Sequence, residues 1–302
     1  MSPILIIFFA TLTMATPLII AALGGLLSEK SGVVNIGLEG MMTFGAFLGA
    51  FVIVMVEPYV GTFSLLIGLI AGALGGLLFG LLHGFLSISL KVDQIISGTA
   101  INIITLASSI YFTKILFGAS ETPSKQTHAI TFIDGKLYLI TIIAFILVAL
   151  IWFVVNKTKW GTHVLAVGEN PQAADAMGIN VIKTRYQAVL CSSMLAGIAG
   201  MAIVFTTTSR FNSAVVSGKG FIALAVLIFG RWTPVGILGA GLLFGFSSSL
   251  GTVAKVVLPD SPIPTIYFEI LPYVITIIAL VVFSRSSIAP SALGQAYDKE
   301  KR

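Results

Sequence analysis

The chain has 302 residues, of which 57% are hydrophobic and only 10% charged, with a mean hydropathy of +1.04 and a formal net charge of +5. Soluble domains carry about 25% charged residues, so this composition excludes an ordinary soluble enzyme. It predicts a protein whose main solvent is the lipid bilayer.

Long apolar segments recur along nearly the whole chain and predict an all-α polytopic membrane protein with about 8–10 transmembrane helices. They lie at residues 4–27, 34–56, 62–88, 94–117, 137–155, 186–208, 219–230, 234–254 and 265–284. At about 20 residues per crossing, we expect one transmembrane domain over residues 1–302 and no separate catalytic domain. The segment 219–230 is too short to cross about 30 Å of hydrocarbon. It is either a half-span or one arm of a re-entrant pair with 234–254.

Glycines at strict four-residue spacing mark the third apolar segment. They are Gly68, Gly72, Gly76, Gly80 and Gly84. Small residues at this spacing let helix backbones approach closely in a membrane, where lipid supplies no hydrophobic drive for association. We therefore predict that this row is a helix-packing surface.

The polar stretch 156–185 is rich in basic residues, which places it on the cytoplasmic side by the positive-inside rule. Within it, Asn170 is a good N-cap, Pro171 suits the first helical position, and Gly178 can end a helix in the left-handed conformation. A helix this short gains little stability alone. It is either a capped turn between two spans or a small helix that inserts into a groove of another protein.

Several kinds of chemistry lack their usual motifs. The sequence has no Gly-rich phosphate-binding loop of the Walker type, so any ATP must be bound by another subunit. The single cysteine, Cys191, excludes an intrachain disulfide and a cysteine-cluster metal site, and the three histidines lie far apart, so we expect no metal. No paired catalytic groups are evident, and the chain is not expected to be an enzyme or to bind nucleic acid.

Four strings carry a resemblance to a known family. The string GENPQAADAMGI at 168–179 resembles the coupling segment of permeases of ABC importers for branched-chain amino acids, ribose and nucleosides. The strings at 26–42 (LLSEKSGVVNIGLEGMM), 93–102 (DQIISGTAIN) and 218–232 (GKGFIALAVLIFGRW) are similar to motifs of the nucleoside branch and occur in the same order.

The resemblance implies a type II-like importer permease in the cytoplasmic membrane of a bacterium. Its implied partners are a second homologous permease, an ABC ATPase subunit that binds the ATP, and an extracytoplasmic lipoprotein that delivers substrate. The ATPase would bind a cytoplasmic coupling helix formed by Gly168, Asn170, Pro171, Ala173, Ala174, Asp175, Met177 and Gly178. A bulky charge at Ala174 is expected to abolish ATP-driven uptake without unfolding the chain.

Polar residues inside apolar segments are the candidates for lining a substrate path. They are Asn35, Glu39, Gln94, Ser97 and Asn102. Amides suit nucleosides, which carry both donors and acceptors. An ionisable residue such as Glu39 in an apolar segment suggests function, but it can equally bind a helix end, and the amides can be interhelical hydrogen-bonding groups. A sugar permease and an ion-gradient secondary transporter remain the alternative functions.

Overall fold

A computed structural model of the chain describes residues 2–124, 129–133, 135–257 and 289–298, with isolated positions between 267 and 278. The helices are α1 (Pro3–Lys30), α2 (Leu38–Val60), η1 (Gly61–Phe63), α3 (Ser64–Gly84), η2 (Phe85–Ser89), α4 (Gln94–Phe117), α5 (Leu139–Lys157), α6 (Lys159–Glu169), α7 (Pro171–Ala176), α8 (Val181–Ile203), η3 (Val204–Thr208), α9 (Lys219–Phe229) and α10 (Pro234–Val257). The strands β1 (Thr131–Phe132) and β2 (Leu137–Tyr138) form a short antiparallel hairpin.

The predicted all-α membrane fold is confirmed. Within the described residues, six segments are long and apolar enough to cross a bilayer, and one of them, 38–89, contains both α2 and α3. Two boundaries differ from the sequence prediction: residues 33–37 are not helical, and residues 137–138 belong to the hairpin rather than to α5. The predicted segment 265–284 lies outside the continuously described residues.

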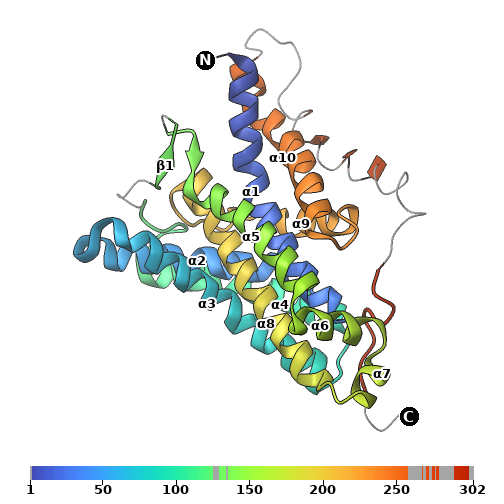
Figure 1. The fold of residues 1–302 in the computed structure, drawn as a ribbon. Helices are drawn as coiled ribbons and strands as arrows, with labels where there is room; N and C mark the ends of the chain where they lie inside the picture. The colour runs from blue at the N-terminus through green and yellow to red at the C-terminus, as the bar shows by residue number, and fades with distance from the viewer. Residues whose placement is uncertain are drawn as a thin grey trace.

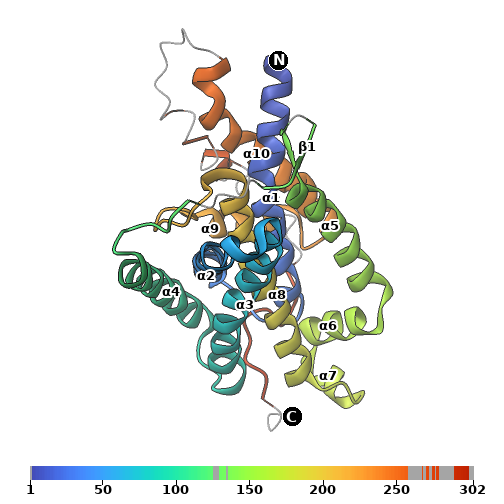
Figure 2. The same cartoon turned by 90° about the vertical axis from the view of Figure 1, so that its left-hand side faces the viewer.

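The centre of the bundle is formed by α1, α2, α3 and α8, with α10 beside α1 (Figure 1). Figure 2 shows α4 along one side of the bundle, and α5 and α6 along the other. The N-terminus lies at one end of the molecule and α7 at the other, which we call the α7 end. The buried residues of the described chain are mostly aliphatic and aromatic, and the buried polar ones are mainly serines and threonines, with Glu29 and Arg185 as the buried carboxyl and guanidinium side chains.

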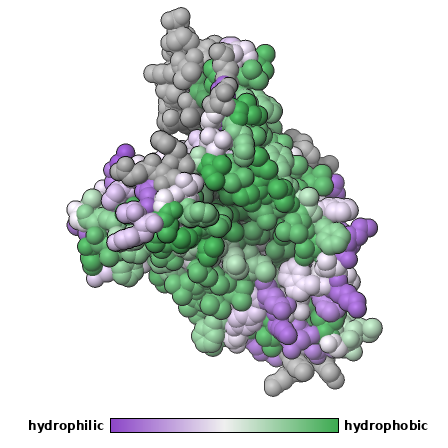
Figure 3. Space-filling view, turned by 60° about the vertical axis from the view of Figure 1, so that its left-hand side comes forward, coloured by the Kyte–Doolittle hydropathy of each residue, from purple (hydrophilic) through white to green (hydrophobic). Residues whose placement is uncertain are grey.

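Figure 3 shows a broad hydrophobic surface between two polar areas, one at the left of the view and one at the lower right. Exposed Lys157, Lys159 and Lys183 lie at the α7 end. The apolar surface between the polar areas is the part that fits a hydrocarbon core, because large side chains such as Ile103 and Leu74 are more than half exposed there.

The glycine row of α3 lies at close contacts with α2 and α8. An added Cβ would lie 2.1 Å from the carbonyl oxygen of Ser193 at Gly76 and 1.8 Å from the Ser193 hydroxyl at Gly80. At Gly72 it would lie 2.4 Å from Met201, and at Gly68 2.3 Å from Ile53. Only at Gly84 is the nearest atom, on the Tyr186 ring, as far as 3.0 Å.

Replacing Gly76 with alanine is expected to destabilise the fold by about 1–3 kcal/mol, because the methyl group meets backbone that cannot turn aside. The matched control is Gly239→Ala in α10, where an added Cβ meets nothing within 4 Å and alanine favours the helix by about 0.5–1 kcal/mol. Thermal unfolding of the two purified variants checks this. Equal stability of both would contradict a packing role for the glycine row.

The segment 219–230 forms α9, a helix of 11 residues that rises about 16 Å. The non-helical residues 209–218 lead into α9. They begin near the end of the molecule where the N-terminus lies, and there Asn212 pairs with Glu121. The chain leaves it beside the last turn of α1, and α10 then runs back along α1, with Gly245 against Ala15. The helix is shorter than a full span, and whether it is a half-span or one arm of a re-entrant pair with α10 stays a prediction.

Candidate functional site

The chain between α1 and α2 is non-helical and is held by polar side chains from neighbouring helices. The Val34 N–H donates to the Gln94 side chain at 2.7 Å, and the Val34 carbonyl lies 3.0 Å from His83 Nε2. A carbonyl only accepts, so Nε2 donates, and a neutral His83 ring then accepts from the Ser97 hydroxyl at Nδ1, 3.0 Å away. Irregular backbone inside a membrane protein requires such partners.

Asn102 of α4 continues this network at the start of α2. Its amide nitrogen donates to the Ile36 carbonyl at 3.0 Å, and its amide oxygen accepts from the Gly40 N–H at 2.8 Å. One side chain therefore satisfies a donor and an acceptor of the same broken segment. It also joins α4 to α2.

Asn35 points into the protein. It is fully buried, and its amide nitrogen donates to the Ser192 hydroxyl of α8 at 3.1 Å. Its amide oxygen has no hydrogen-bond partner within the described chain. A buried acceptor without a partner costs free energy. The Asn35 side chain could therefore accept a further hydrogen bond at its amide oxygen.

Glu39 binds the start of α9. Its two carboxylate oxygens accept from the Gly218 N–H at 2.7 Å and from the Gly220 N–H at 2.6 Å. The first turn of a helix has unpaired N–H groups and a positive dipole end, both of which favour a carboxylate. Gly220 allows this approach, because an added Cβ would lie 2.5 Å from the Glu39 backbone.

A second carboxylate holds the other end of α9. Trp232, in the turn that follows the helix, donates from its indole nitrogen to Glu29 of α1 at 2.6 Å, and both residues are buried. The half-length helix is thus bound to α1 at its end and to α2 at its beginning. The contact between Trp232 and Glu29 could not be predicted from the sequence, since the two partners lie 203 positions apart.

The five predicted path residues lie in or beside one non-helical segment, residues 31–37, and all five form hydrogen bonds to its backbone or to neighbouring helices. Sequence reasoning missed Ser192 and Trp232. The position of His83 inside an apolar segment predicts a hydrogen-bonded residue between helices, and the structure confirms this. Asn35, Gln94 and Ser97 are buried in this conformation. That these five line a solute path stays a prediction.

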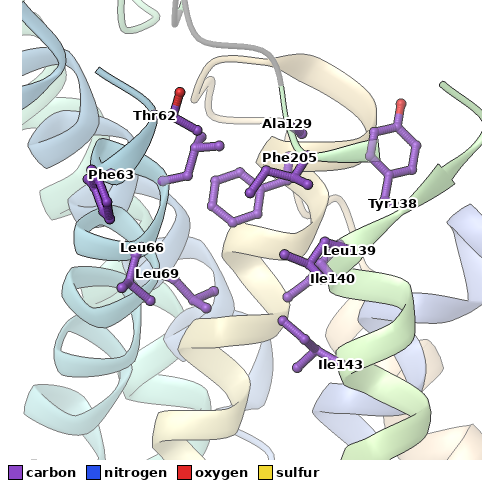
Figure 4. Close-up of a pocket in the computed structure, with 12 residues that line it drawn as sticks. Thr62, Phe63, Leu66, Leu69, Ala129, Tyr138, Leu139, Ile140, Ile143 and Phe205 are labelled. Carbon is purple, nitrogen blue, oxygen red and sulfur yellow. The ribbon is translucent and has the colours of Figure 1, made fainter. Parts of the chain in front are cut away.

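A separate apolar cavity of about 450 Å³ lies between α3, α5 and η3 near the N-terminal end. Figure 4 shows the Thr62 and Tyr138 hydroxyls at its rim, with Leu69 and Ile143 at the opposite side. Its lining is otherwise hydrocarbon, and it contains none of the predicted path residues. It does not suit a polar solute that must exchange its hydrogen bonds with water.

The polar stretch 156–185 contains two helices rather than one. The capped helix α7 is as predicted: Asn170 accepts from the Ala173 N–H at 3.0 Å, Pro171 is the first residue, and Gly178 has φ +83°. The preceding helix, α6, was not predicted, although Thr158 is its N-cap and accepts from the Gly161 N–H at 3.1 Å.

The two faces of α7 differ. Ala174 is 4% exposed and packs against Val167 and Val181, whereas Met177 at the end of the helix is 83% exposed. The expectation for Ala174 is therefore corrected: an arginine there would disrupt the chain's own packing before it reached a partner. The surface available to another protein is formed by the exposed residues Gln172, Ala173, Ala176, Met177 and Gly178.

No group of three or more histidine, cysteine, aspartate or glutamate side chains with the geometry of a metal site occurs in the described ranges. His128 lies outside them. The polar cluster is built from hydrogen bonds between helices, and α7 has an exposed face at the opposite side from Ala174.

Comparison with known proteins agrees with this architecture. The family described as the branched-chain amino acid transport system / permease component matches residues 7–280. The guanosine ABC transporter permease protein NupQ of Bacillus subtilis is 40% identical, with 98% of both chains covered. The nucleoside ABC transporter permease protein NupC of Lactococcus lactis is 34% identical over 95% of both chains. The Bacillus subtilis guanosine permease protein NupP is 28% identical over 92% of this chain and 81% of its own length. The chain therefore belongs to this permease family and is a multi-pass membrane protein.

Proposed function

We propose that the chain is a permease subunit of an ATP-driven ABC importer for nucleosides in the cytoplasmic membrane. The observation that carries the proposal is the likeness to two nucleoside permeases over nearly the full length of each chain. The exposed, capped helix α7 supports it, because a permease without its own ATP site needs a surface through which an ATPase acts.

The solute would follow a path beside the polar cluster. Guanosine, named in the description of NupQ, carries ribose hydroxyls and base edges that both donate and accept hydrogen bonds. Asn35 has an unpaired amide oxygen, and Glu39 and Asn102 sit where α2, α4 and α9 meet. Rearrangement of these helices would bring such groups to the solute.

A second, longer permease would complete the path. This chain is similar both to NupQ and to NupP, two guanosine permease proteins of one organism, and the alignment leaves a larger part of NupP uncovered. The exposed apolar side chains of α4, such as Ile103 and Tyr111, offer a surface for another transmembrane chain or for lipid. Co-purification of a tagged copy of this chain with a longer permease at equal amounts tests this arrangement.

ATP would drive the cycle through α7. Closure of the partner ATPase dimer would push the exposed face of α7, and α6 would pass the displacement to α5 and to the end of α1. The coupling surface would comprise the residues between Gly168 and Gly178, with Ala174 as its internal support and Met177 as its outermost apolar contact.

The deciding experiment is uptake into proteoliposomes that contain the two permeases, the ATPase and the binding lipoprotein. We expect uptake of labelled guanosine that requires internal ATP and is reduced by excess adenosine or cytidine but not by glucose. Competition by glucose alone would favour the sugar permease. Uptake by this chain alone, driven by a sodium or proton gradient, would refute the proposal in favour of a secondary transporter.

A further inference from the structure

The segment 290–298, which we call the C-terminal strap, is seated across the α7 end of the bundle. Its backbone bonds to two other segments: the Ala292 N–H donates to the Gly168 carbonyl at 2.9 Å, and the Gly294 N–H donates to the Gly32 carbonyl at 3.1 Å. Gly168 lies in the last turn of α6, shortly before α7 begins, and Gly32 follows α1. The strap is thus hydrogen-bonded both to the end of α6 and to the chain that follows α1.

The buried side chain of Arg185, near the start of α8, is hydrogen-bonded to the strap. It is 1% exposed, its Nε donates to the Ser31 carbonyl at 3.1 Å, and its Nη1 donates to the Gln295 carbonyl at 2.9 Å. A buried guanidinium needs its acceptors, because a buried N–H group left without one costs about 1–3 kcal/mol or more. Release of the strap would withdraw the Gln295 carbonyl, so Arg185 favours the seated position.

Gly32 lets these groups meet. Its φ of +88° suits glycine, and an added Cβ would lie 2.8 Å from Arg185 Nη2 and 3.1 Å from the Ala292 carbonyl oxygen. The end of α1, the start of α8 and the strap are therefore in direct contact at one point.

The strap also supports α7 itself. Tyr297 packs against the cluster formed by Val167, Ala174 and Val181, which contains the buried face of α7. Ser291 donates from its hydroxyl to Glu169 at 2.7 Å, at the junction of α6 and α7. A helix of six residues has little rigidity of its own, so its position depends on these supports.

We infer that the C-terminal strap is a positioning element of energy coupling, which keeps α7 in fixed relation to α1 and α8 so that motion of the ATPase reaches the transmembrane bundle. The inference rests on the proposed function. The strap itself touches neither ATP nor solute. With the strap released, ATP hydrolysis would move α7 without moving α1 in proportion.

The test measures solute moved per ATP hydrolysed by the complete importer in proteoliposomes. Ala292→Pro removes the N–H that donates to Gly168, and we expect the ratio to fall about fivefold or more, the lower range of coupling between sites, while ATP hydrolysis continues. A chain that ends at Ala289 should show at least the same loss. Two controls are expected to keep the normal ratio of solute moved per ATP. Ala292→Gly retains the N–H group, and a chain that ends at Asp298 retains the whole strap.

An unchanged ratio in Ala292→Pro and in the chain ending at Ala289 would overturn the inference. Loss of the ATPase from the purified complex of these variants would also overturn it, because the strap would then serve assembly rather than transmission. Failure of the proposed function itself is distinguishable: it would appear in the unmodified importer, as an absence of ATP-dependent guanosine uptake.

Discussion

Replacement of Glu39 by alanine is expected to lower the free energy of unfolding by about 3–5 kcal/mol and to abolish uptake. The carboxylate accepts from the N–H groups of Gly218 and Gly220, and hydrogen bonds to a charged group contribute about 1.5–3 kcal/mol each. Without them the N–H groups of Gly218 and of the buried Gly220 lose their acceptors at the start of α9. Its 11 residues fall below the length at which an isolated helix is stable, about 12–15 residues.

The variant Glu39→Gln tests the contribution of the negative charge, because glutamine has nearly the same size and shape as glutamate. The amide keeps one acceptor oxygen but turns an NH₂ group toward the second backbone donor, so about half the loss is expected. The matched control is Glu121→Gln, because Glu121 pairs with Arg210 where both side chains are more than 40% exposed. Such pairs contribute about 1 kcal/mol or less. Thermal unfolding and uptake of each variant provide the comparison. Full stability of Glu39→Ala with loss of uptake would show that the carboxylate serves the solute rather than α9.

Replacement of Met177 by lysine is expected to reduce ATP-dependent uptake about 30-fold or more while leaving the permease folded. Met177 is 83% exposed at the end of α7, so lysine there disturbs no internal packing. As a central apolar contact of a protein interface it would contribute about 2 kcal/mol or more, and each 1.4 kcal/mol is a factor of about ten in affinity.

Two controls accompany this variant. Met177→Leu keeps an apolar side chain of similar size and should retain uptake. Tyr59→Lys makes a comparable change at a residue that is 87% exposed in the last turn of α2, far from α7. Co-purification of the ATPase measures docking directly. If Met177→Lys binds the ATPase and transports as the unmodified chain does, α7 is not the coupling helix.

The sequence predicted what depends on short-range chemistry. Apolar length predicted the helices, and the N-cap at Asn170 with Gly178 at the end predicted α7, because caps act within one turn. The helix α6 was missed because its residues, among them Trp160 and His163, mix apolar and polar types in a way that suits a loop equally well.

Contacts between distant segments could not be predicted in the same way. The sequence identified Glu39 as an unusual charge but not its partners, which lie 179 and 181 positions away. It treated Ala174 as an outward residue because small side chains suit either face, and only the cluster with Val167 and Val181 shows that the residue is internal. The strap at 290–298 carried no recognisable motif, since its bonds are made mainly by backbone atoms.

The close packing of the glycine row limits how the transporter can change shape. The backbones of α3 and α8 meet without intervening side chains, since a Cβ at Gly197 would lie 2.1 Å from the Gly72 carbonyl oxygen. Sliding one of these helices along the other would bring Met201, which lies one turn after Gly197 on the same face of α8, opposite the bare backbone at Gly76. We therefore expect α3 and α8 to move together as one rigid body. The hinges of that motion would lie in neighbouring segments that are joined by side-chain hydrogen bonds.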